Sequence, residues 1–187
     1  MIRRLLRKPV TWVVLVLLGG LGAFGLYWFT PWKLITSTTV HDALSSPVPA
    51  TTAPAGTSAT NPGGPAGPVV IAKGTLISHE HTTSGEVRIV RKADGTRQLE
   101  IANLITSDGP DLRVWLTDQA VQTGSSGWTV FDDGRYVELG PLKGNKGDQV
   151  YAIPATLDLG AYRSITIWCK RFSVSFGAAE LDRTAGG

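Results

Sequence analysis

The hydrophobic and polar positions divide the chain into three segments. Residues 10–29 are almost all apolar and carry no charge. A run of this length at helical rise spans about 30 Å, the thickness of a bilayer's hydrocarbon core. Residues 37–68 are mostly Ser, Thr, Pro, Ala and Gly, whereas residues 70–182 contain short alternating runs separated by turn signals. The pattern therefore predicts a membrane-spanning helix, a linker and one folded domain.

The apolar run has the flanks of a membrane anchor. Basic residues precede it and aromatic residues lie near both of its ends, namely Arg3, Arg4, Arg7 and Lys8, then Trp12, Tyr27, Trp28 and Trp32. By the positive-inside rule, residues 1–9 form a cytoplasmic basic tail and the C-terminal domain lies outside. A cleavable signal peptide is the alternative, but the run exceeds the usual h-region and no small-x-small site follows it. We therefore expect residues 10–29 to form a single-pass signal anchor in the plasma membrane, with the lipid bilayer as its partner.

Residues 30–69 are predicted to be a disordered linker rich in Pro, Thr, Ala and Gly, because they contain too little apolar surface to offset the entropy of ordering. As a flexible coil this segment would hold the following domain about 35 Å from the membrane, and ~100 Å if fully extended. His41 is expected to be a solvated residue of the linker. Residues 183–187 are expected to form a flexible tail.

Residues 70–182 are predicted to be all-β. Alternating runs occupy residues 74–78, 85–91, 98–102, 112–116, 149–153, 164–170 and 172–181, with Gly, Asp and Pro between them. No helical period of useful length occurs in this segment. We predict a β-sandwich of about seven to nine mostly antiparallel strands, preceded by the membrane helix and the disordered linker.

The alternation also predicts which face of a strand each side chain occupies. Ile165, Ile167 and Cys169 share one face, as do the apolar positions of residues 112–116, and these faces are predicted to form the core. Trp168 is predicted to lie on the outer face. Because free cysteine is among the most buried residue types, Cys169 is well suited to fill space in the core as a small apolar group.

Charge and cysteine content limit the classes of function. From residue 70 onward there are 13 Lys plus Arg and 14 Asp plus Glu, so the domain is nearly neutral and no nucleic-acid partner is predicted. Exported domains usually pair their cysteines in disulfides, yet this chain has one. Cys169 is therefore either a buried apolar group or a chemically used sulfur. The chain has no Cys-x-x-Cys-His motif, which excludes covalently attached c-type haem.

His79 and His81 are the other residues with candidate chemistry. Two residues apart on an extended segment, they would project to one side and could share a metal or face a ligand. Only Glu80 is near them in sequence and it points the other way, so surface polar residues are the preferred interpretation and no metal site is predicted. The Gly-rich stretch 140–147 lacks phosphate-loop spacing, and no hydrolase triad is present. These features favour a binding module, or a module that uses the Cys169 sulfur, over a stand-alone enzyme.

Four blocks carry a family resemblance. They are Gly74-Thr-Leu with His81-Thr-Thr-Ser-Gly85, then Asp108-Gly-Pro-Asp-Leu-Arg-Val-Trp-Leu116, then Leu139-Gly-Pro-Leu-Lys-Gly-Asn-Lys-Gly-Asp-Gln149-Val-Tyr-Ala-Ile-Pro154, and Tyr162-Arg-Ser-Ile-Thr-Ile-Trp-Cys169 with the residues up to Leu181. Together they resemble the DM-thirteen (electron transfer) domain. The resemblance covers nearly all of the outer domain and nothing before it. It implies a β-sandwich with a redox role centred on Cys169, either as a bare thiol or as the ligand of a prosthetic group such as haem.

Two functions of different classes follow. In the first, the chain is a membrane-anchored redox module outside the cell, with Cys169 as its redox thiol or cofactor ligand. His81, which falls in a family block, is then a second candidate for binding the cofactor, and a redox partner protein is expected at the cell surface. The alternative is a non-catalytic binding or interaction module in which Cys169 is a buried core residue.

Overall fold

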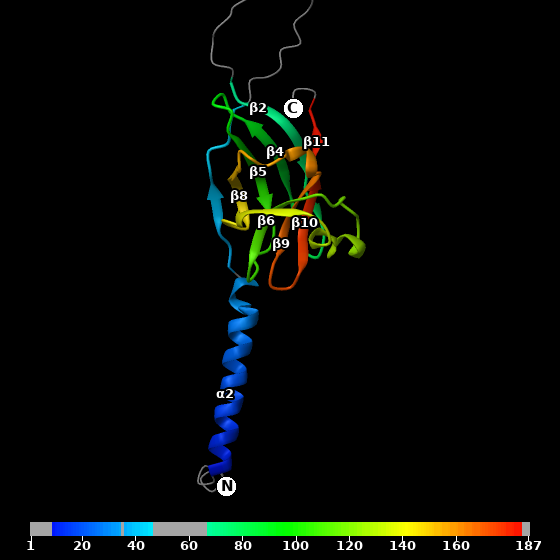
Figure 1. Cartoon of the computed structure of the whole chain (residues 1–187). Helices are drawn as coiled ribbons and strands as arrows, with labels where there is room; N and C mark the ends of the chain where they lie inside the picture. The colour runs from blue at the N-terminus through cyan, green and yellow to red at the C-terminus, as the bar shows by residue number, and fades with distance from the viewer. Residues whose placement is uncertain (1–8, 35, 47–66, 185–187) are drawn as a thin grey trace, which may run out of the picture.

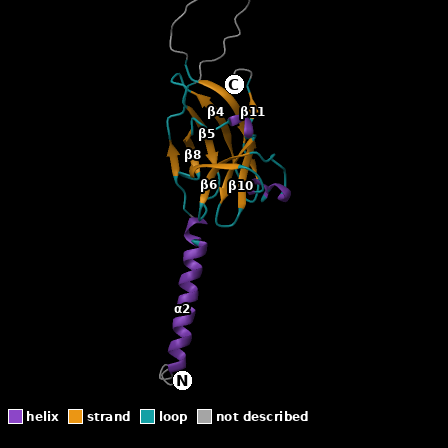
Figure 2. Ribbon diagram, viewed as in Figure 1, coloured by secondary structure: helices purple, strands orange, loops and turns teal. Residues whose placement is uncertain are grey.

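The computed structural model describes residues 9–34, 36–46 and 67–184. One long helix is attached to one end of a β-sandwich, and the C-terminal strand lies towards the opposite end (Figure 1). Strands dominate the described part of the domain, with only short helical turns in the loops (Figure 2). The predicted fold class is therefore confirmed.

The long helix, α2, runs from Pro9 to Phe29 and has no buried side chain. Its 21 residues are long and apolar enough to cross a membrane. The helix ends before Pro31, because a proline disfavours helical backbone in the residue that precedes it. A 3₁₀ turn, η1 (Pro31–Leu34), follows directly. Residues 1–8, in which the cytoplasmic tail was predicted, lie outside the described residues.

The sandwich has two sheets. In order across each sheet, the first contains β1 (Thr39–His41), β8 (Lys146–Ile153), β5 (Arg97–Ile105), β4 (Ser84–Arg91), β2 (Val69–Thr75) and β11 (Asp182–Arg183). The second contains β3 (Ile77–Ser78), β10 (Val174–Glu180), β9 (Ser164–Cys169), β6 (Leu112–Thr117) and β7 (Tyr136–Pro141). All pairs are antiparallel except β1 with β8. The eight longer strands fall within the predicted seven to nine, and β1, β3 and β11 are additional strands of two or three residues.

The main core lies between the two sheets and is formed by the faces that the alternation predicts. Ile165, Ile167 and Cys169 of β9 belong to it, and so do the apolar positions of β6. Full burial of an aliphatic side chain of this size contributes about 1.5–3 kcal/mol. The β9 strand is buried on both of its faces, so it is a central strand of the second sheet.

A second, smaller cluster covers the outer face of the second sheet. It contains Trp115, Phe131, Trp168 and Ala178. The rings of Trp115 and Trp168 stack with centroids 5.1 Å apart, and Phe131 meets Trp168 edge-on. Trp168 therefore points outward as predicted, but only 1% of it is exposed, because residues 118–135 fold over it. This segment includes the 3₁₀ turns η2 (Ser125–Gly127) and η3 (Val130–Asp132), and a further turn, η4 (Leu159–Ala161), precedes β9.

The segment predicted as linker is partly built into the sandwich. Residues 36–46 run along the edge of the first sheet, where β1 pairs in parallel with β8. Gly147 of β8 has a φ of +91°, and a Cβ there would collide with the carbonyl oxygen of Val40, so glycine permits the close approach of β1. The expected separation of the domain from the helix is therefore wrong. Residues 47–66 lie outside the described residues, as do residues 185–187 of the predicted tail. Its first two residues are not a tail, because Arg183 belongs to β11 and Thr184 N donates to the carbonyl oxygen of Ile71 on β2.

Candidate functional site

Cys169 lies at the end of β9 and faces the main core. Its register partners are Leu112 on β6 and Val174 on β10, and none of its surface is exposed. Burial raises the pKa of the thiol, and hydrogen bonding from the backbone of the following turn lowers it by less. The sulfur is therefore a protonated thiol at neutral pH, which is a weak nucleophile.

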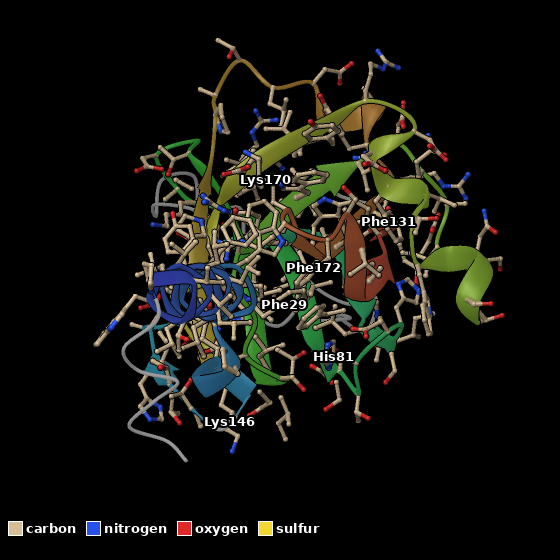
Figure 3. The ribbon with its side chains drawn as sticks, turned by 90° about the horizontal axis from the view of Figure 1, so that it is seen from below. Phe29, His81, Phe131, Lys146, Lys170 and Phe172 are labelled. Atoms are coloured by element: carbon tan, nitrogen blue, oxygen red, sulfur yellow. The ribbon has the colours of Figure 1, made fainter. Side chains whose placement is uncertain are left out.

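His81 borders a hollow of about 460 Å³ at the end of the sandwich where α2 is attached, which we call the helix-proximal end. The lining residues are Phe29, Pro31, Glu80, His81, Asp108, Gly109, Pro110, Phe172, Val174 and Phe176. The His81 ring packs on Phe176 with centroids 3.8 Å apart, and its Nε2 lies 2.5 Å from Oε2 of Glu80. Seen from below, Phe29, Phe172 and His81 lie on the same side of the helix axis (Figure 3).

The two histidines do not share a site. His79 is not the surface polar residue that was predicted, since it is only 8% exposed and packs on Phe131 of the outer cluster, away from the hollow. Its Nδ1 is 2.8 Å from the Ser175 hydroxyl, and its Nε2 is 3.0 Å from the Gln122 carbonyl oxygen. Burial lowers the pKa of His79, so the ring is neutral; Nε2 contacts the covering segment 118–135, whereas Nδ1 contacts β10. Within the described ranges, no group of three His, Cys, Asp or Glu side chains is placed to hold a metal ion.

Cys169 lies next to the hollow, but its side chain is not part of the lining. Val174, the cross-strand partner of Cys169, lines the hollow, whereas Cys169 itself does not. Haem ligated by the Cys169 sulfur therefore does not fit this geometry, because an axial ligand must reach the ring directly. A ligand in the hollow can therefore contact His81, whereas the residues that line the hollow separate it from the Cys169 thiol.

The turn after Cys169 also contacts the last turn of α2 and so connects the sandwich to the helix. One Nη of Arg171 donates hydrogen bonds to the carbonyl oxygens of Tyr27 (3.2 Å) and Trp28 (2.6 Å), which are carbonyls of the last helical turn. A cation at a helix C-terminus is favourable because the helix dipole is negative there. Phe172 stacks on Phe29 with centroids 6.0 Å apart. These contacts were not predicted, since no spacing rule links a hairpin turn to a helix more than a hundred residues earlier.

The comparisons with known proteins give one match. Residues 75–181 match the family described as Electron transfer DM13. Searches of the curated proteins and of the solved structures gave no significant match. The matched range contains all eight longer strands except most of β2, and it includes Cys169, His81 and the turn that carries Arg171. The match covers more than half of the chain, and the chain therefore belongs to the Electron transfer DM13 family.

Proposed function

We propose that the chain is a membrane-anchored, extracytoplasmic electron-transfer module whose exchange site is the helix-proximal end of the sandwich. Family membership supports the electron-transfer role. The length and composition of α2, with the basic residues before it, support the anchoring and its orientation. We assign the exchange site to this end because three features lie there together: the attachment of α2, the hollow with His81, and Cys169.

In this proposal His81 contacts the redox group and Cys169 is the candidate redox thiol behind it. Because Cys169 has no exposed surface, its thiol chemistry requires the β9–β10 turn to open. His81 needs no such opening, since it already borders the hollow. A redox partner at the cell surface would then exchange electrons at this same end.

A mediated redox titration of the full chain in nanodiscs, followed by absorbance, tests the electron-transfer role. We expect the redox group that His81 contacts, retained by the purified chain, to take up electrons reversibly, because the Cys169 thiol is already fully reduced. Replacing His81 by Asn should shift or abolish the transition, because this residue lines the hollow. Tyr136→Ala is the matched control, since Tyr136 is also a partly exposed aromatic packing partner but lies on β7, outside the hollow. A chain that takes up no electrons contradicts the proposal.

The second candidate is the non-catalytic binding module, and the burial of Cys169 favours it. In that function the sulfur only fills space between Leu112 and Val174. Cys169→Ala would then leave the redox titration and any partner binding unchanged. Loss of electron uptake in Cys169→Ala would instead support the redox thiol.

Alkylation measures the state of Cys169 directly. We expect iodoacetamide to modify the native chain at least about 100-fold more slowly than the chain in denaturant, because reaction requires opening of the turn and loss of the thiol proton. We also expect Cys169→Ala to lower the free energy of unfolding by about 1–2 kcal/mol through the small cavity it leaves. Rapid modification of the native chain would contradict the core-residue function and strengthen the redox thiol.

A further inference from the structure

The hollow lies where a ligand dissolved in the bilayer would reach the domain. Phe29, one of its lining residues, is the last residue of α2. If α2 crosses the membrane, Phe29 lies at the boundary between hydrocarbon and water. The next lining residue along the chain is Pro31 of η1, so the hollow extends from this boundary into the end of the sandwich.

The lining combines a broad apolar wall with a small polar edge. Phe29, Phe172, Val174 and Phe176 form most of the wall, and three of these four side chains are aromatic. The polar edge consists of Glu80 and His81, which pair with one another, and of Asp108, whose carboxylate pairs with Lys33. Among the described residues no hydrogen bond reaches Nδ1 of His81, so this nitrogen is available to a ligand. The volume, about 460 Å³, is within the range of small-molecule sites.

These features select the chemistry of the ligand. Aromatic walls favour a planar ring, which stacks on them or meets them edge-on. The polar edge favours a ring that carries oxygen atoms able to bond an imidazole, because an aliphatic chain would cover His81 and Glu80 without replacing their hydrogen bonds to water. The position at the membrane boundary favours a ring with an apolar tail.

We propose that the hollow binds the head group of a lipid-soluble quinone, which enters from the outer leaflet past Phe29. The quinone ring packs against Phe172 and Phe176. With a proton on each ring nitrogen, His81 donates from Nε2 to Glu80 and from Nδ1 to one of the quinone's carbonyl oxygens. The tail remains along the end of α2 in the bilayer. This assignment rests on the proposed electron-transfer function, for which it names the small-molecule carrier.

Photolabelling of the full chain in phosphatidylcholine nanodiscs tests the assignment. The probe is an azido-substituted quinone with an isoprenoid tail, and mass spectrometry locates the labelled peptides. We expect saturable labelling of peptides that contain His81 or residues 172–176, and competition by the same quinone without the azide. Phe172→Ala should weaken binding about ten-fold, because one aromatic wall is lost. Phe172 is 44% exposed, so this substitution leaves the core intact.

Two comparisons make the result decisive. His81→Gln should weaken binding as well. Tyr136→Ala should leave binding unchanged, since Tyr136 is about as exposed as Phe172 but lies on β7, outside the hollow. Labelling confined to residues 9–29, or equal competition by a phospholipid, would overturn the assignment and indicate a lipid-facing surface only. If the redox titration succeeds without quinone binding, only the ligand is wrong; if the quinone binds but the chain exchanges no electrons, only the proposed function fails.

Discussion

Replacing Arg88 by Met is expected to lower the free energy of unfolding by about 3–5 kcal/mol, because it leaves a buried carboxylate without its partner. Glu100 has no exposed surface, and its Oε2 accepts a hydrogen bond of 2.6 Å from Nε of Arg88. Arg88 also donates to the carbonyl oxygen of Ser45, so the same substitution removes one of the hydrogen bonds that hold Ser45 against the first sheet. Urea denaturation of the full chain in detergent, followed by tryptophan fluorescence, measures the loss.

The matched control is Arg163→Met. Arg163 pairs with Glu180 at the same 2.6 Å separation, but their side chains are 59% and 36% exposed. An exposed pair of this kind contributes about 0.2–1 kcal/mol, so the control should change stability little. Equal losses of unfolding free energy in the two variants would contradict this prediction. They would show that the Arg88–Glu100 pair contributes no more than an exposed pair and does not stabilise the β1 segment.

The loss of unfolding free energy in Arg88→Met should also depend on pH. Burial alone would raise the pKa of Glu100, but the hydrogen bonds from Ser45, Gln98 and Arg88 together hold it below its usual 4.5. A carboxyl group with a lowered pKa stabilises the fold above its unfolded pKa, and this contribution disappears as the pH falls through the folded value. The difference between the native chain and Arg88→Met should therefore be largest at neutral pH and narrow as Glu100 is protonated in acid.

The strands with regular alternation could be predicted from the sequence, whereas β1 could not. Residues 112–116 and 164–169 show the period of two because one face of each strand meets the main core. In β1, Val40 is the only apolar residue, and the strand is held by backbone pairing and by Asp42, whose carboxylate accepts from Val150 N. The available signal was the pair Gly144 and Gly147, where a side chain would collide with the β1 segment.

The candidate site was predictable only in part. Alternation placed Cys169 on the core face, because that inference needs a single strand. The hollow is assembled from α2, η1, the β3–β4 connection, the loop before β6, the β9–β10 turn and strand β10, so its residues have no common spacing. The contact between Arg171 and the end of α2 is equally non-local. A sequence pattern predicts the environment of a residue within its strand but not which distant segment closes over it.

The burial of Trp168 in the outer cluster likewise depends on a distant segment and could not be predicted from its own strand. This burial supports the second prediction with a large expected effect. Trp168→Ala is expected to lower the free energy of unfolding by about 3–5 kcal/mol, because it removes the largest fully buried side chain and leaves a cavity beneath residues 118–135. The ring packs between Trp115 and Phe131, so the covering segment loses its main support. Urea denaturation measures the cost, and limited proteolysis should show new cleavage within residues 118–135.

Tyr136→Ala provides the comparison for this cluster. Tyr136 stacks on Trp115 with centroids 4.0 Å apart but is 45% exposed, so its removal opens no closed cavity and should cost about 1–2 kcal/mol. If Trp168→Ala costs no more than Tyr136→Ala, the outer cluster does not act as a second core. If it costs more but no new cleavage occurs, residues 118–135 are held by the His79 and Ser164 hydrogen bonds to Gln122 and Gln119 instead of by the aromatic rings.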